Sequence, residues 1–249
     1  MQRTKSNIKK TFIYQFETSF LIEQESDSVR FYFSDKDCLS ETNKFLSNLV
    51  KNNVEIIYFN SQPSIVPSLY FDEKIDYKYL NTNTLISESI ITDTSSDKKI
   101  KVVYSISDEL SELLIKNELE YSNNNYFTYL YDFLVNKVSK SSGLSFFVNL
   151  NNKSFDIIIF NNHEFIFFNS FKINDENEFL YYLFFVLKNY ESSIKTDKVM
   201  FLGKFEQFKD YYDIASKYSI IDFIDYKNYT SVINDSPFFS IVNENYIGN

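Results

Sequence analysis

The chain has 249 residues, enough for one large domain or two similar lobes, and its 44% hydrophobic and 24% charged content is ordinary for a globular protein. It holds 27 Phe and 20 Tyr but only three Gly and three Pro, which excludes collagen-like and Pro-rich proteins and argues against a Gly-rich phosphate loop. A single His excludes multi-histidine metal sites, and a net charge of −9 disfavours nucleic acid, whose backbone repels an acidic surface.

The first half of the chain mixes strand and helix patterns. Short runs rich in β-branched and aromatic residues predict strands at 12–24, 29–33, 54–59, 87–92 and 101–106. Apolar residues at helical spacing predict helices from Ser40, as N-cap, to about Lys51, through 70–80, from Ser107 onward and over 127–138. The polar segment 93–99 is a predicted turn between the last two strands.

The second half is patterned more regularly. Three runs of strand length, 144–150, 154–160 and 164–172, are separated by the pairs Asn151-Asn152 and Asn161-Asn162. Asn tolerates positive φ, so these pairs predict tight turns. The remaining pattern predicts a helix at 179–190, a strand at 198–202, a turn at Gly203, a helix at 205–218 and a strand at 220–224.

The order β-β-β-α-β-α-β therefore occurs in the second half and, less cleanly, in the first. Crossovers of this type imply mixed sheets that contain parallel pairs. We predict an α/β protein with two lobes: an irregular ribonuclease H-like lobe at 1–140 and a second one at 141–249, joined near 140–143. The doubled order resembles that of actin, Hsp70 and the sugar kinases, in which a ribonuclease H-like fold is duplicated.

Several segments carry a narrower resemblance. They are 64–70 (SIVPSLY), 102–107 (VVYSIS), 165–171 (FIFFNSF), the pair Tyr181-Tyr182, and 201–203 (FLG). On these segments the chain resembles a family of bacterial proteins, domain of unknown function 3822, which is regarded as actin-like in fold. The resemblance implies the two-lobed architecture and assigns no activity.

Nucleotide chemistry depends on the first hairpin of each lobe. Actin-type ATPases carry an Asp-x-Gly turn there, because Gly admits the phosphate and Asp positions Mg²⁺. In the second lobe the matching positions are Asn149 and Asn151, so the acid and the glycine are both missing, and the first-lobe segment 15–25 contains no Gly. The adenosine side needs a Gly pair, and Gly203 is a single Gly after a strand. We therefore expect no ATP hydrolysis and interpret Gly203 as a tight strand-to-helix turn.

Two other reactive side chains have a structural interpretation. His163 beside Glu164 can act as a general base, but it follows a turn signal and no nucleophile lies near it in the sequence, so we expect an exposed turn residue. Cys38 precedes a helix start, where a helix dipole can lower a thiol pKa. With no second Cys in the chain, we interpret Cys38 as a small structural residue.

A ribonuclease H-like nuclease needs carboxylates that converge on two metal ions. Asp156 lies on a predicted strand, and Asp222 and Asp225 flank another. Asp156 is as easily the solvent-facing member of an alternating strand, and the acidic chain shows no basic groove, so the sequence does not favour a nuclease. We expect no metal site and no cofactor.

The aromatic excess fits the composition bias of an AT-rich genome, but Tyr-rich faces also suit protein recognition. Seven tyrosines cannot all lie in the core: Tyr121, Tyr126, Tyr129, Tyr211, Tyr212, Tyr226 and Tyr229.

Two functions stay open at this point. The favoured one is a cytoplasmic, non-enzymatic actin-like adaptor that has lost nucleotide hydrolysis and binds an unidentified protein partner. The alternative is a nucleotide-dependent enzyme of the actin and sugar kinase class with an atypical Gly-free site. The single Cys38 fits a reducing cytoplasm, and no apolar run reaches the roughly 18 residues of a membrane span. The oligomeric state does not follow from the sequence.

Overall fold

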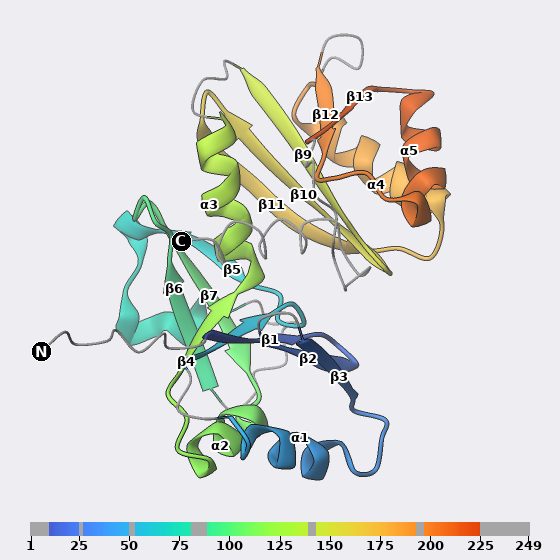
Figure 1. Ribbon diagram of the computed structural model, residues 1–249. Helices are drawn as coiled ribbons and strands as arrows, with labels where there is room; N and C mark the ends of the chain where they lie inside the picture. Colours follow the sequence, from blue (N-terminus) through green and yellow to red (C-terminus); the bar gives the residue numbers. More distant parts are fainter. Residues whose placement is uncertain are drawn as a thin grey trace, which may run out of the picture. The chain divides into compact units, whose positions relative to one another are not determined.

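The computed structural model describes residues 10–24, 27–49, 53–80, 89–138, 143–192 and 197–224 (Figure 1). The chain divides into two compact units, Met1–Asp132 and Phe133–Asn249. In its described part each unit contains one five-stranded mixed sheet. The predicted junction at 140–143 lies mostly outside the described residues, so the lobe limits 1–140 and 141–249 stay predictions.

The large sheet of the first unit has the strand order β3-β2-β1-β4-β8. β2 is antiparallel to β1 and β3, whereas β4 is parallel to β1 and β8. Two short helices belong to the same unit. The bounds are β1 Lys10–Gln15, β2 Ser19–Gln24, β3 Asp27–Tyr32, α1 Cys38–Leu46, β4 Asn53–Tyr58, α2 Glu109–Lys116 and β8 Tyr121–Asn125.

A three-stranded antiparallel sheet of order β5-β7-β6 is inserted between β4 and α2 in the chain. Without this insertion the first unit also reads β-β-β-α-β-α-β, which explains why its sequence repeats the order less cleanly. α3 follows β8 and leads into the second unit. The bounds are β5 Ser64–Pro67, η1 Ser68–Tyr70, η2 Glu73–Lys78, β6 Ser89–Thr94, β7 Ile100–Ile106 and α3 Tyr126–Val138.

The sheet of the second unit repeats the arrangement in the order β11-β10-β9-β12-β13. A three-stranded antiparallel meander is extended by two parallel strands, so β9 corresponds to β1 and β12 to β4. The sequence predicts each of these elements, with shifts at the ends. The bounds are β9 Leu144–Asn151, β10 Ser154–Asn161, β11 Glu164–Lys172, α4 Glu176–Asn189, β12 Lys198–Phe201, η3 Glu206–Phe208, α5 Lys209–Ser216 and β13 Ile220–Phe223.

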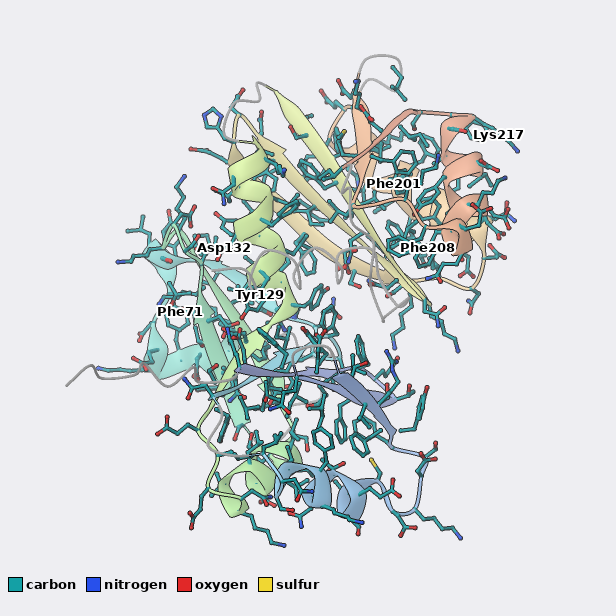
Figure 2. All side chains as sticks on the ribbon, viewed as in Figure 1. Phe71, Tyr129, Asp132, Phe201, Phe208 and Lys217 are labelled. Carbon is teal, nitrogen blue, oxygen red and sulfur yellow. The ribbon has the colours of Figure 1, made fainter. Side chains whose placement is uncertain are left out.

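α4 and α5 pack on the same face of the second sheet. Alternate strand residues, such as Val148 and Ile157, share one buried cluster with residues of both helices. Figure 2 shows Phe201 and Phe208 between the sheet and these helices. The intervening strand residues, among them Ile158, are fully buried as well. Both faces of this sheet are therefore covered, which is why its strands are apolar without alternation.

The turn between β10 and β11 consists of Asn162 and His163, with φ values of 46° and 64°. Positive φ at both central residues is typical of a type I′ turn, whose twist matches that of the flanking strands. The structure confirms that His163 is an exposed turn residue. Asn and His enter this region of φ more readily than most residues, so a Gly-poor chain can still form the turn.

We expect His163→Val to lower the free energy of unfolding by about 1–2 kcal/mol, because a β-branched side chain is strained at positive φ. His163→Gly relieves that strain and should raise the free energy by up to about 0.5 kcal/mol, while His163→Ala should change it by less than about 0.5 kcal/mol. Urea unfolding measures all three. Equal stability of the Val and Gly variants would rule out the turn geometry.

Three predictions for the first unit are wrong. The run 12–24 is not one strand but β1 and β2, because the chain turns between them with a hydrogen bond from Phe16 N–H to Ser19 C=O at 2.8 Å. Ser40 is not an N-cap: it lies inside α1, which Asp37 precedes. The helix expected at 70–80 is instead the pair η1 and η2, with non-helical backbone at Ile75.

The sequence pattern also misses β8 and misplaces Asp93. β8 reads Tyr-Ser-Asn-Asn-Asn and has no apolar alternation, so it is defined by parallel pairing with β4 rather than by hydropathy. Asp93 was expected in a polar turn but belongs to β6, where its side chain is buried. In the described part of the chain, no helix combines the length and hydropathy of a membrane span.

Candidate functional site

The carboxyl ends of the parallel strands form one edge of each sheet, and α/β proteins bind ligands at such edges. In the first unit this edge is made by the β1–β2 turn and the residues that follow β4 and β8. In the second unit it is made by the β9–β10 turn and the residues that follow β12 and β13. The sequence-predicted positions Asn149, Asn151 and Gly203 all lie at or next to the second edge.

Asn149 is tied to a carboxylate inside the protein. Its side chain is fully buried, and its Nδ2 donates to Asp156 Oδ2 at 2.8 Å. Asn151 Nδ2 donates to the same oxygen at 3.3 Å. Asp156 lies opposite Asn149 in the β9–β10 pair and is itself fully buried, so its interpretation as a solvent-facing residue is wrong. The two amides therefore stabilise a buried carboxylate that would otherwise be costly to remove from water.

At the matching edge of the first sheet, aromatic rings form a stack. Phe16 in the β1–β2 turn stacks on Phe59 with ring centroids 5.1 Å apart. Phe59 stacks in turn on Tyr126 at 5.1 Å with an interplanar angle of 15°. The guanidinium of Arg30 lies 5.0 Å from the centroid of Phe16. Each of the three parallel strands is thus followed by a ring of one stack. The first of these rings, Phe16, lies in the hairpin where an actin-type ATPase carries its Asp-x-Gly turn.

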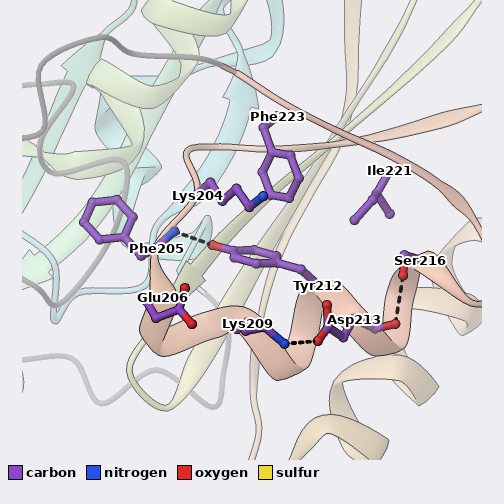
Figure 3. Close-up of a pocket in the computed structure, with 9 residues that line it drawn as sticks. All are labelled: Lys204, Phe205, Glu206, Lys209, Tyr212, Asp213, Ser216, Ile221 and Phe223. Carbon is purple, nitrogen blue, oxygen red and sulfur yellow. Dashed lines mark hydrogen bonds and ion pairs between the residues drawn. The ribbon is translucent and has the colours of Figure 1, made fainter.

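A cavity of about 290 Å³ lies beyond Gly203 in the second unit (Figure 3). Gly203 has a φ of 89°, which Gly adopts without strain, and its carbonyl accepts a hydrogen bond from the Tyr212 hydroxyl at 3.3 Å. The same hydroxyl accepts the Phe205 N–H at 3.2 Å. The lining residues are Lys204, Phe205, Glu206, Lys209, Tyr212, Asp213, Ser216, Ile221 and Phe223.

Two of the charged lining residues form an ion pair, and a third lies over an aromatic ring. Lys209 Nζ lies 2.5 Å from Asp213 Oδ2, and Lys204 Nζ lies 5.2 Å from the ring centroid of Phe223. Aromatic rings and paired charges, rather than a run of backbone N–H groups, therefore make most of its wall. Such a cavity can admit a small polar molecule, but it lacks the second Gly that brings a backbone close to an adenosine.

A buried polar cluster surrounds Asp93 in the first unit. Its Oδ1 accepts the Tyr104 hydroxyl at 3.0 Å, and its Oδ2 accepts the Asn125 N–H at 2.7 Å and the Thr128 hydroxyl at 2.8 Å. Burial raises the pKa of Asp93 to about 6, although the three hydrogen bonds act in the opposite direction. The carboxylate links β6 and β7 to the N-terminus of α3, where negative charge is favourable. Nothing in the hydropathy pattern marked this residue.

The remaining candidates do not form a reactive site. Cys38 is buried at the start of α1, and burial raises the pKa of its thiol, so the alternative of a dipole-activated thiolate is wrong. Asp222 is half exposed and forms an ion pair with Lys198 at 3.3 Å. Asp225 lies outside the described residues. Within the described ranges, no group of three or more His, Cys, Asp or Glu side chains could hold a metal ion.

Of the seven tyrosines that were expected not to lie all in the core, the five that the structure describes are mostly inside. Three are buried and two are half buried, while Tyr226 and Tyr229 lie outside the described residues. The buried ones are Tyr126, Tyr129 and Tyr212, and the half-buried ones are Tyr121 and Tyr211. Among the described residues of the second unit, the exposed Phe and Tyr rings are Tyr181 and Phe185 of α4 and Tyr218 after α5. The spacing of four between 181 and 185 was the available signal, because it places both rings on one side of the helix.

Comparisons with known proteins agree with this fold. The family model described as "Protein of unknown function (DUF3822)" matches residues 6–220. A protein of Bacteroides thetaiotaomicron VPI-5482, described as having an actin-like ATPase fold and unknown function, is similar in structure with a TM-score of 0.75 and 15% identity over 98% of each chain. The PilM-PilN type IV pilus biogenesis complex gives a TM-score of 0.55 and 7% identity over 94% of this chain and 90% of that one. No curated protein sequence matches the chain.

These identities are low, so the structural likeness concerns the fold and not the activity. The family match, in contrast, spans most of the sequence and includes every strand of the two five-stranded sheets except most of β13. The chain therefore belongs to the DUF3822 family and has the actin-like ATPase fold.

Proposed function

We propose that this protein is a cytoplasmic adaptor that binds another protein and that has lost the nucleotide hydrolysis of actin-type ATPases. The proposal rests on the residues of the β1–β2 and β9–β10 hairpins, which are the hairpins that hold phosphate in an actin-type ATPase. Hydrolysis requires an acid that positions Mg²⁺ and a backbone that approaches the phosphate closely. Neither hairpin offers this pair of features.

In the second unit Asn149 occupies the position of the acid that positions Mg²⁺, and its amide donates a hydrogen bond to Asp156 inside the sheet. In the first unit the turn places Phe16 in a stack with Phe59 and Tyr126. Restoring a phosphate site would require breaking the buried hydrogen bond in one unit and the ring stack in the other. The two changes are independent, and each is unfavourable for the folded protein.

Protein binding is supported by exposed aromatic surface. Tyr181 is 65% exposed and stacks on Phe185 at 6.4 Å, and Tyr218 packs against Phe184 at 6.0 Å. Rings that lie on the surface in contact with one another are typical of protein interaction sites. PilM, in the complex with PilN, is an example of a similar fold in a protein assembly, which supports the proposal by analogy of fold alone.

The cavity beside Gly203 favours a second candidate, a nucleotide-dependent enzyme with an atypical site. Its volume of about 290 Å³ is close to the lower limit of small-molecule sites. A molecule bound there would lie next to paired charges, Lys209 with Asp213. The carboxylate of the neighbouring hairpin, Asp156, is fully buried and accepts a hydrogen bond from Asn149 instead of facing a Mg²⁺ site. We therefore rank this candidate second.

Affinity capture tests the adaptor proposal. The tagged full chain is expressed in its native host, crosslinked and purified, once with Mg-ATP and once with a chelator. We expect the same partner in comparable yield under both conditions. A partner that is captured only with Mg-ATP, or no partner in either sample, would contradict the proposal. A bait of unrelated fold but equal net charge identifies proteins that bind to acidic surfaces in general.

A further inference from the structure

A small apolar pocket in the first unit lies where the β1–β2 turn, the segment from β3 to α1 and the start of α2 meet. Its volume is about 20 Å³, enough for a methyl-sized group. Phe33 and Leu39 on its rim are 44% and 50% exposed, whereas Phe20 and Leu110 are buried. The lining residues are Gln15, Phe20, Phe33, Leu39, Ser107, Glu109, Leu110 and Leu113.

Gln15 is the buried polar residue of this pocket, whereas Ser107 and Glu109 are partly or fully exposed. The Gln15 side chain is 8% exposed, and its Oε1 is buried without a hydrogen-bond partner. The residue is fixed at the end of β1, where its carbonyl accepts the Phe59 N–H at 2.8 Å. A buried amide oxygen without a partner is unfavourable and points to a missing donor. A peptide backbone offers an N–H donor beside an apolar side chain, whereas a lipid chain offers no donor.

The surface around the pocket is acidic. The two segments that flank it, 33–41 and 107–113, carry six acids and one lysine. The acids are Asp35, Asp37, Glu41, Asp108, Glu109 and Glu112, and the lysine is Lys36. A segment with Lys or Arg on either side of an apolar anchor is complementary to this surface. An anionic membrane surface is repelled by it.

We propose that this pocket docks a short basic segment of a partner protein, with one apolar side chain as the anchor. The tip of the anchor enters between Phe33 and Leu39, the Gln15 amide turns toward the pocket, and a backbone N–H beside the anchor donates to Gln15 Oε1. Basic side chains of the partner then face the acids on α2 and before α1. The inference rests on the proposed adaptor function and names the chemistry of the partner.

Selection from a displayed library of random short peptides on the intact protein tests this inference. We expect the enriched peptides to combine a side chain that ends in a methyl group, such as Leu or Ile, with Lys or Arg. A synthetic copy of an enriched peptide, followed by fluorescence anisotropy, should bind Leu39→Lys at least about tenfold more weakly than the wild type, a loss of about 1.4 kcal/mol. Leu69→Lys is the matched control, because Leu69 is 85% exposed in the same unit and lies outside the pocket, and it should bind as the wild type does.

A second variant tests the hydrogen bond to the side-chain amide of Gln15. Gln15→Leu keeps the apolar wall and removes the acceptor, so the peptide should bind about fivefold more weakly while the melting temperature stays equal or rises. Binding should also weaken as salt increases from about 50 to 300 mM, because the acids are exposed to solvent. Peptides that bind Leu39→Lys as well as the wild type, acidic peptides, or no enriched peptides would overturn the inference. The adaptor proposal survives that result if the wild type and Leu39→Lys capture the same host protein.

Discussion

Asn149→Asp should lower the free energy of unfolding by about 3 kcal/mol at neutral pH, although it restores the acid that a phosphate turn requires. The Nδ2 of Asn149 lies 2.8 Å from Asp156 Oδ2, and both side chains are fully buried. The substitution replaces a hydrogen-bond donor with a second carboxylate at the same place. Two buried carboxylates at this distance cannot both be ionised without a large penalty.

Urea unfolding at two pH values measures this effect. At lower pH one of the two carboxyl groups stays protonated and can donate a hydrogen bond to the other. The loss of unfolding free energy relative to wild type should therefore shrink as the pH falls from about 7 to 4. Asn189→Asp is the matched control, since Asn189 is exposed at the end of α4, and its effect should stay within about 1 kcal/mol. A stable Asn149→Asp protein at pH 7 would mean that this position is open to solvent or to a metal ion, against the structure.

Asp93→Ala should lower the free energy of unfolding by about 3 kcal/mol, because it leaves three buried donors without an acceptor. Those donors are the Tyr104 hydroxyl, the Asn125 N–H and the Thr128 hydroxyl, at 2.7–3.0 Å from the carboxylate. Asp210→Ala, at an exposed Asp in the first turn of α5, is the control and should change stability by less than about 1 kcal/mol. A loss below 1 kcal/mol for Asp93→Ala would contradict the buried cluster.

Asp93 should also make the free energy of unfolding depend on pH, with lower stability at higher pH. Burial raises the folded-state pKa of Asp93 to about 6, above its ordinary value of 3.8, so the folded protein binds this proton more tightly than the unfolded chain does. The resulting stabilisation is fully present below about pH 3.8 and is lost as pH rises through 6. Relative to Asp93→Asn, which does not titrate, the wild type should gain about 2–3 kcal/mol between pH 7 and pH 4. A constant difference between the two proteins across this range would show that the pKa is not raised.

The second unit could be predicted from the sequence because its strands are compact apolar runs, and Asn pairs mark the two turns of its meander. The first unit could be predicted only in part, for physical reasons that differ by element. β8 is an Asn-rich strand stabilised by backbone pairing with β4, and pairing partners leave no trace in local hydropathy. The turn at Phe16–Thr18 contains neither Gly nor Pro, so the run through it looks continuous. The apolar spacing after Pro67 suggested a helix over 70–80, but the chain forms 3-10 turns there.

The sequence predicted where the candidate site lies but not which of its residues contact one another. The sequence located Asn149, Asn151 and Gly203 by analogy with phosphate turns, but nothing in it showed that the first two bind Asp156. The stack of Phe16, Phe59 and Tyr126 joins residues far apart in the chain. The only sequence signal for this stack is an aromatic residue directly after each of three strands. In a chain with 47 Phe and Tyr residues (27 and 20), that pattern also occurs by chance.

The loss of nucleotide binding is the central claim, and calorimetric titration of Mg-ATP into the intact chain tests it most directly. We predict no binding heat and no rise in melting temperature at millimolar Mg-ATP, because a ligand that binds only the folded state must raise that temperature. A dissociation constant in the micromolar range, equivalent to about −8 kcal/mol, would contradict the claim and favour a nucleotide site at the cavity beside Gly203.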